Sequence, residues 1–97
     1  MKTYTLCGSM RFEKEMQEIA YYLEIQKGYN ILQCVYNVGK KKPTVKELQT
    51  LKLAHYKKID MSDGIYVINI DGYVGESVQK EIDYAKRHNK EIIYHCY

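Results

Sequence analysis

The sequence has little cysteine, and tyrosine supplies nearly all of its aromatic residues: it contains three Cys, one Pro, one Phe and no Trp among 97 residues. It also lacks the run of about 18 apolar residues that a membrane-spanning helix needs. Its amino-terminal segment has no long apolar region of the kind found in secretory signals. We therefore expect a cytoplasmic protein that neither crosses a membrane nor is secreted.

Several common ligand-binding motifs are also missing. Cys7, Cys34 and Cys96 form no CxxC pair and no His/Cys spacing suited to zinc, so buried free thiols in a reducing compartment explain them best. Neither the dinucleotide fingerprint GxGxxG nor a P-loop occurs, which disfavours NAD binding and P-loop ATP hydrolysis. We expect no metal and no cofactor.

The composition is that of an ordinary folded domain. About 45% of the residues are hydrophobic and 28% are charged, and the length fits one domain over residues 1–97. Basic and acidic residues are largely intermixed and sum to +3, so we expect no nucleic-acid polymer as a partner. The lysine cluster at residues 40–42 is better explained by a solvated loop than by a phosphate patch. The eleven tyrosines suit a subunit interface.

Strand-like and helical segments alternate along the chain. Short runs of aliphatic, β-branched and aromatic residues predict strands at residues 3–7, 30–36, 65–70 and 91–95. The run at 65–70 lacks clean alternation, which is typical of a central parallel strand covered on both faces. The alternation predicts an α/β fold of the flavodoxin-like kind, with an open parallel sheet of about four strands and helices on both faces.

Three helices are expected between these strands. Helical spacing of apolar residues begins at Phe12 and stops at Gly28, and a capping-box pattern at Thr44 and Glu47 starts a second helix that runs to about Met61. The third helix is expected at about 76–88. The second helix is expected to bury the apolar residues Val45, Leu48, Leu51 and Ile59, and the third to bury Val78, Ile82 and Ala85.

Two loops are candidates for ligand binding, because open α/β sheets bind ligands outside the carboxyl ends of their strands. The first follows the first strand and contains the candidate residues Gly8, Ser9, Met10, Arg11 and Phe12. There Gly8 permits close backbone approach and Arg11 can meet an anion. A plain strand-to-helix turn with a capping serine explains this loop equally well.

The second loop leads from the apolar third strand into the third helix. Its candidate residues are Asn69, Asp71, Gly72, Tyr73, Gly75, Glu76 and Ser77. The free N–H groups and the dipole of the helix favour a phosphate or carboxylate there. One turn further, Glu81 lies at the margin of the buried stripe, where a surface ion pair is the competing explanation. His55 on the second helix is as well explained by a structural role.

Three groups of residues resemble the nucleoside 2-deoxyribosyltransferase superfamily, which includes deoxynucleoside monophosphate N-glycosidases. They are Leu6-Cys7-Gly8-Ser9-Met10-Arg11-Phe12, Ser62-Asp63-Gly64-Ile65, and Gly75-Glu76-Ser77 followed by Glu81-Ile82-Asp83-Tyr84-Ala85. The resemblance implies a flavodoxin-like fold and a base and sugar pocket at Gly8 to Arg11. It also implies a nucleophile at Glu81, a 5′-phosphate contact at Ser77, and a homodimer or larger oligomer whose subunits complete each other's pockets.

The sequence departs from this family at His55, which stands where members usually carry an aspartate. The resemblance implies attack of Glu81 on C1′ of a nucleoside or nucleoside 5′-monophosphate, with His55 or Asp71 assisting, and either hydrolysis or transfer to a second base. An imidazole cannot supply a carboxylate's charge, so a non-catalytic nucleotide-binding or sensor module is the alternative. A weaker alternative is an interaction protein in which the glycine-containing loops are only turns.

Overall fold

The computed structural model describes residues 1–39 and 41–96, so Lys40 of the predicted lysine loop lies outside the described residues. The described part contains four strands and three α-helices in the predicted order. The strands are β1 (Thr3–Cys7), β2 (Asn30–Leu32), β3 (Gly64–Val67) and β4 (Glu91–Tyr94). The helices are α1 (Glu13–Lys27), α2 (Val45–Asp60) and α3 (Glu76–Arg87).

The four strands form one sheet in the order β2-β1-β3-β4. Each neighbouring pair is parallel, which confirms the predicted open α/β sheet of the flavodoxin-like kind. The chain leaves β1 toward β2 and then returns across β1 to reach β3. The strand order therefore switches between β1 and β3, and the carboxyl ends of these two strands are the expected ligand edge.

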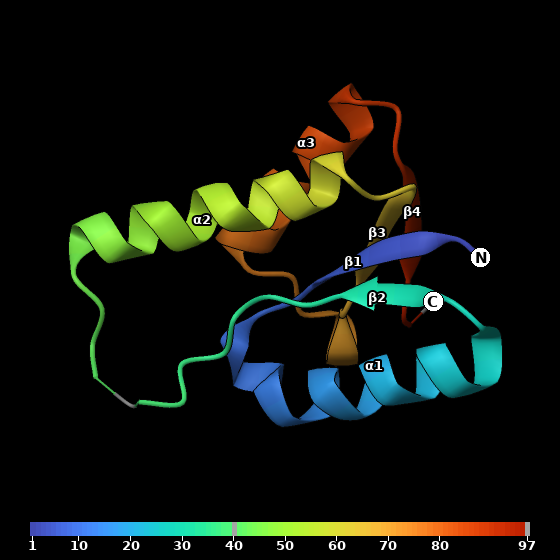
Figure 1. Ribbon diagram of the computed structural model, residues 1–97, viewed down its shortest axis with the longest axis horizontal. Coiled ribbons are helices and arrows are strands. Elements are labelled where there is room, and N and C mark those ends of the chain that lie inside the picture. Colours follow the sequence, from blue (N-terminus) through green and yellow to red (C-terminus); the bar gives the residue numbers. More distant parts are fainter. Residues whose placement is uncertain (40, 97) are drawn as a thin grey trace.

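The helices cover both faces of the sheet, with α1 on one face and α2 and α3 on the other (Figure 1). Alternate side chains of β1 explain the two layers. Tyr4 and Leu6 pack against α1 residues such as Met16, whereas Cys7 lies in a second cluster with α2 and α3 residues such as Ile82. The predicted inward residues of α3 are all buried: Val78, Ile82 and Ala85.

The local signals for helix ends are also confirmed. The Thr44 hydroxyl accepts the Glu47 backbone N–H at 3.1 Å, and the Glu47 carboxylate accepts the Thr44 N–H at 2.8 Å, which completes the capping box. At the end of α1, Gly28 adopts φ = 68°, the left-handed conformation that glycine tolerates best. None of the helices in the described residues is long and apolar enough to cross a membrane.

The prediction for α2 was partly wrong. Ile59 is fully buried, but Val45, Leu48 and Leu51 are exposed by 74%, 51% and 42%. The amino-terminal half of α2 extends beyond the sheet, so no strand lies beneath its apolar positions (Figure 1). Helical spacing identified the apolar face correctly but gave no information on how far the sheet extends.

Three strands are shorter at their carboxyl ends than predicted. β2 ends at Leu32 rather than at residue 36, β3 ends at Val67 rather than at 70, and β4 ends at Tyr94 rather than at 95. After β3, the backbone turns into a short 3-10 segment at Ile70–Gly72, with Asp71 at φ = 55° and Gly72 at φ = 75°. The apolar run thus continues past the strand into the loop at the ligand edge.

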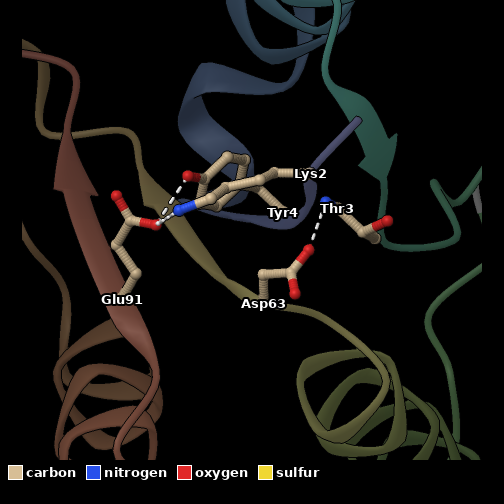
Figure 2. A network of polar contacts seen from close by, with 5 residues as sticks. All are labelled: Lys2, Thr3, Tyr4, Asp63 and Glu91. Carbon is tan, nitrogen blue, oxygen red and sulfur yellow. Dashed lines mark hydrogen bonds and ion pairs between the residues drawn. The ribbon is translucent and has the colours of Figure 1, made fainter.

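A polar network joins the amino ends of β1, β3 and β4 (Figure 2). The Glu91 carboxylate accepts the Tyr4 hydroxyl at 2.7 Å and the Lys2 ammonium at 3.1 Å, while Asp63 accepts the Thr3 backbone N–H at 2.8 Å. This edge is opposite the carboxyl ends of the strands, and its side chains are already paired. The network therefore fixes the sheet and leaves the other edge for ligands.

The Glu91 network makes the stability of the fold depend on pH under acidic conditions. Hydrogen bonds from Tyr4 and then Lys2 lower the pKa of Glu91 below its usual range. A carboxyl group whose pKa is lower in the folded state stabilises the protein above its unfolded pKa, and this contribution is lost as pH falls through the folded pKa. We expect the Tm of Glu91→Gln to fall less than that of the wild type when the pH is lowered from neutral to acidic. The effect is small because the Glu91 side chain is half-exposed. Circular dichroism measures the Tm at each pH, and parallel curves of Tm against pH for the two proteins would contradict the prediction.

Candidate functional site

Three ionisable side chains from three elements meet at the carboxyl end of β1. The Cys7 Sγ atom lies 3.5 Å from His55 Nε2, and the same nitrogen lies 3.3 Å from Glu81 Oε1. The three ligand-type atoms lie within 4.8 Å of one another. Cys7 is fully buried, and the side chains of His55 and Glu81 are only 10% and 15% exposed. We call Cys7, His55 and Glu81 the trio.

Each member of the trio is positioned by its element. Cys7 is the last residue of β1 and points to the face covered by α2 and α3. His55 lies one turn before the fully buried Ile59 on the inner face of α2. Glu81 precedes the buried Ile82 on α3, which places it at the margin of the buried stripe, as the spacing predicted.

The contacts of His55 indicate where its proton lies. Its Nδ1 atom is buried and has no hydrogen-bond partner among the described residues. A proton on Nδ1 would leave a buried donor unpaired and would turn the Nε2 lone pair toward the Glu81 carboxylate. A proton on Nε2 avoids both of these costs and leaves Nδ1 as a buried acceptor without a partner among the described residues. His55 therefore donates to Glu81.

Cys7 is not arranged as an activated nucleophile. Burial, followed by the charge of Glu81 and a hydrogen bond with it, raises the pKa of the Cys7 thiol well above its usual value. The thiol has Thr5 O as an acceptor at 3.8 Å. In a cysteine-histidine-carboxylate triad the two imidazole nitrogens are used separately, whereas here Nε2 faces both Cys7 and Glu81. The arrangement therefore does not activate Cys7.

The loop after β1 has clear structural roles. A side chain at Gly8 would lie 2.9 Å from Ile68 Cβ and 3.0 Å from Met16 Sδ, so packing alone requires glycine there. The Ser9 hydroxyl accepts the Arg11 backbone N–H at 3.4 Å and caps the 3-10 turn at Met10–Phe12. The simple turn with a capping serine is therefore present, whatever the loop also binds.

Aromatic and cationic contacts join the first candidate loop to the second. The Arg11 guanidinium lies 3.7 Å from the centre of the Tyr73 ring, and the Phe12 ring meets Tyr73 edge-on at 6.0 Å. Phe12 also belongs to the buried α1 core, while Met10 is half-exposed. The structure thus brings Arg11 of the β1 loop beside the loop that leads into α3.

Other residues of the second loop separate into two groups. The Asn69 side-chain amide donates to Cys96 O at 2.9 Å and accepts the Cys96 N–H at 2.7 Å, so it holds the segment after β4. Asp71 and Gly72 are exposed at the tip, and the Asp71 carboxylate makes no hydrogen bond or ion pair with the described residues. Asp71 is therefore not brought into contact with the trio.

The amino terminus of α3 has free backbone donors. Gly75 is its N-cap residue and supplies no side-chain cap. Ser77 is exposed, and the exposed Glu76 carboxylate pairs with Lys80 at 3.4 Å. These positions suit an anion bound from solvent, as the helix dipole predicts.

No protein-family model, curated protein or solved structure matches this chain. The family resemblance of its motifs therefore remains an expectation. Part of the resembling sequence has a structural role at the opposite edge, because the Ser62 hydroxyl lies 2.6 Å from Thr5 Oγ1 and Asp63 accepts a β1 N–H. The function is inferred from the geometry at the carboxyl edge.

A second feature of this edge was not anticipated from the sequence. An open hollow of about 780 Å³ lies between the segment after β2 and the first half of α2. Val35, Val38, Pro43 and Leu51 give it a largely apolar lining. Its volume falls within the roughly 300–1,000 Å³ range of small-molecule sites. The trio does not line the hollow, but Leu51 lies one turn before His55 on the same face of α2.

The sequence did not predict two features of this site, the role of Cys7 and the hollow, for different reasons. Cys7 was assigned to the core because a buried thiol beside a glycine turn carries no ligand signal of its own. The hollow depends on a strand that ends early and a helix that extends beyond the sheet, and neither length follows from periodicity. Only the register of β1 against the inner faces of α2 and α3 brings the trio together.

Proposed function

We propose that this protein cleaves the N-glycosidic bond of a nucleoside or nucleoside 5′-monophosphate with Glu81 as the nucleophile. The observation that carries the proposal is the Glu81 carboxylate, which is mostly buried at the carboxyl end of β1 and lies 3.3 Å from His55 Nε2. A desolvated and oriented carboxylate at the strand-order switch suits attack on an electron-poor sugar carbon. The resemblance at Gly8 to Arg11 and at Glu81 supports the same chemistry.

The reaction divides into two displacements. The Glu81 carboxylate forms a bond to C1′ while the C1′–N bond breaks and its electron pair leaves with the base. The base takes a proton from solvent or from an assisting group, for which His55 is the candidate beside Glu81. Asp71 is exposed at a loop tip and is not in contact with the trio. Water then attacks C1′ and releases Glu81, which gives hydrolysis, or a second base attacks and gives transfer. His55 also orients the carboxylate through its hydrogen bond.

The carboxyl edge of the sheet offers a place for each part of a nucleotide. The apolar hollow beside Leu51 suits a planar base. Arg11, Ser77 and the uncapped amino terminus of α3 supply donors for a 5′-phosphate. We therefore propose nucleoside 5′-monophosphates as the preferred class, with hydrolysis favoured over transfer.

The test is a panel of ribo- and 2′-deoxyribonucleosides and their 5′-monophosphates, incubated with the purified protein. Chromatography measures the release of free base, and an added second base reveals transfer. Release from monophosphates at a higher kcat/KM than from nucleosides is expected. If no substrate releases base while a monophosphate still raises the Tm, the enzyme proposal fails and the nucleotide-binding module replaces it.

The proposal also includes a homodimer or larger oligomer in the cytoplasm. Val45, Leu48 and Leu53 of α2 are large apolar residues exposed by 74%, 51% and 71%, which suits burial against a second subunit. The three cysteines are free, which suits a reducing compartment. Light scattering coupled to gel filtration should give a mass above that of one chain. A monomer at the concentration of the activity assay would remove this part of the proposal.

A further inference from the structure

The trio has the donor set of a transition-metal site. It offers a thiol sulfur, an imidazole nitrogen and a carboxylate oxygen, which are the three ligand types that zinc takes in proteins. Magnesium and calcium prefer oxygen ligands alone, so sulfur and nitrogen select against them. The three donors come from β1, α2 and α3, so a bound ion would join three elements of the fold.

Two of the three distances within the trio fit the same assignment. A tetrahedral zinc ion with Zn–S near 2.3 Å, Zn–N near 2.0 Å and Zn–O near 2.0 Å separates sulfur from nitrogen by about 3.5 Å, and nitrogen from oxygen by about 3.3 Å. The structure has Cys7 Sγ and His55 Nε2 at 3.5 Å, and His55 Nε2 and Glu81 Oε1 at 3.3 Å. The third pair, the Cys7 sulfur and the Glu81 carboxylate oxygen, lies within 4.8 Å. A tetrahedral ion needs about 3.5 Å between these two atoms, so binding requires the Glu81 side chain to move toward Cys7.

Hydrogen bonds alone cannot join all three side chains of the trio well. The single Nε2–H of His55 can point at Glu81 or at Cys7, but not well at both. An ion placed among the three atoms would accept an electron pair from each of them at once.

We propose that Cys7, His55 and Glu81 bind one zinc ion reversibly, with the fourth position open to water or a small ligand. Binding displaces the protons of the Cys7 thiol and of His55 Nε2, and the imidazole then carries its proton on Nδ1. That atom has no partner among the described residues, so the site lacks the outer contact that strengthens permanent zinc sites. A chelator is expected to remove the ion without unfolding the chain.

This inference stands on the geometry of the trio and not on the proposed function, although both use Glu81. Zinc bound to the Glu81 carboxylate withdraws electron density from it and occupies the space beside it, so we expect an occupied site to inhibit nucleophilic attack on C1′. If the protein releases bases, zinc inhibits it and a chelator restores the rate. If it releases none, zinc binding is unaffected, so the two proposals fail separately.

The test uses untagged protein and cobalt(II), which gives a thiolate charge-transfer absorption in the near ultraviolet and visible bands when it is tetrahedral. We expect one equivalent of cobalt to bind and zinc to displace it. Cys7→Ser should abolish the charge-transfer absorption, and Glu81→Gln should weaken cobalt binding at least about tenfold. Cys96→Ser, which replaces a half-buried thiol beyond β4, should leave both the spectrum and the affinity unchanged.

Glu81→Gln keeps the test valid if Cys7→Ser does not fold, because Glu81 lies at the margin of the core and glutamine has the same shape. Circular dichroism before titration establishes that each variant is folded. The proposal is overturned if the folded wild type shows no charge-transfer absorption with excess cobalt. It is equally overturned if that absorption persists in folded Cys7→Ser or if Cys96→Ser loses it.

Discussion

Glu81→Gln is expected to lower the rate of base release at least about a thousandfold, because an amide cannot replace the carboxylate that forms the bond to C1′. A loss of this size corresponds to about 4 kcal/mol of transition-state stabilisation. The Tm should change little, since glutamine is isosteric and its side-chain oxygen can still accept the His55 Nε2–H. Steady-state kinetics with the best monophosphate of the panel measure the effect.

The matched control is Asp83→Asn, which makes the same change from acid to amide two residues along α3. Asp83 is exposed and accepts a hydrogen bond from Gln79 at 3.1 Å on the same helix. This variant should retain the wild-type kcat and KM. Retained base release in folded Glu81→Gln would exclude Glu81 as the nucleophile. A similar loss in both variants would show that a general change in charge or stability is responsible.

The order of the elements followed from the sequence because hydrophobic period and turn chemistry are local properties. The capping box at Thr44 and Glu47, the stop at Gly28 and the buried stripe of α3 each depend on residues within a few positions of one another. The extents of the strands did not follow, because a strand ends where its partner ends. β3 stops at Val67 for this reason, opposite Cys7 and Tyr94, the last residues of β1 and β4. β2 instead leaves the sheet after Leu32, although β1 continues past the paired Thr5 to Cys7.

In the candidate site, too, local features could be predicted from the sequence, whereas contacts between elements could not. Position along α3 predicted that Glu81 would lie at the margin of the core, and it is 15% exposed there. Its pairing with His55 depends on how α2 and α3 pack together, and no spacing in the sequence encodes that contact. The sequence departs from the resembling family at His55, and the structure places the Nε2 atom of this residue 3.3 Å from the carboxylate of the proposed nucleophile. An imidazole donor there can orient the carboxylate but adds no negative charge to the site.

Gly64 illustrates how a residue within a stretch that resembles a family motif can be required by the fold. It lies opposite Tyr4 on one side and Glu91 on the other at the start of the central strand β3. A Cβ atom on Gly64 would overlap the Glu91 carbonyl oxygen and would lie 2.8 Å from Glu91 Cβ and 2.9 Å from its carbonyl carbon. The obstacle is mainly backbone, which cannot move aside without disturbing the β3–β4 pairing and the Glu91 network.

We therefore expect Gly64→Ala to destabilise the fold by about 3 kcal/mol, the size of a severe overpacking substitution. In a domain of this length the Tm should fall by roughly 15 °C. Gly39→Ala is the matched control, since among the described residues a Cβ there would meet only Asn37 Oδ1, at 3.9 Å. Its Tm should stay close to that of the wild type. An unchanged Tm in Gly64→Ala would mean that β4 moves away from β3 at little cost. The glycine of this motif would then need an explanation other than the close approach of the two strands.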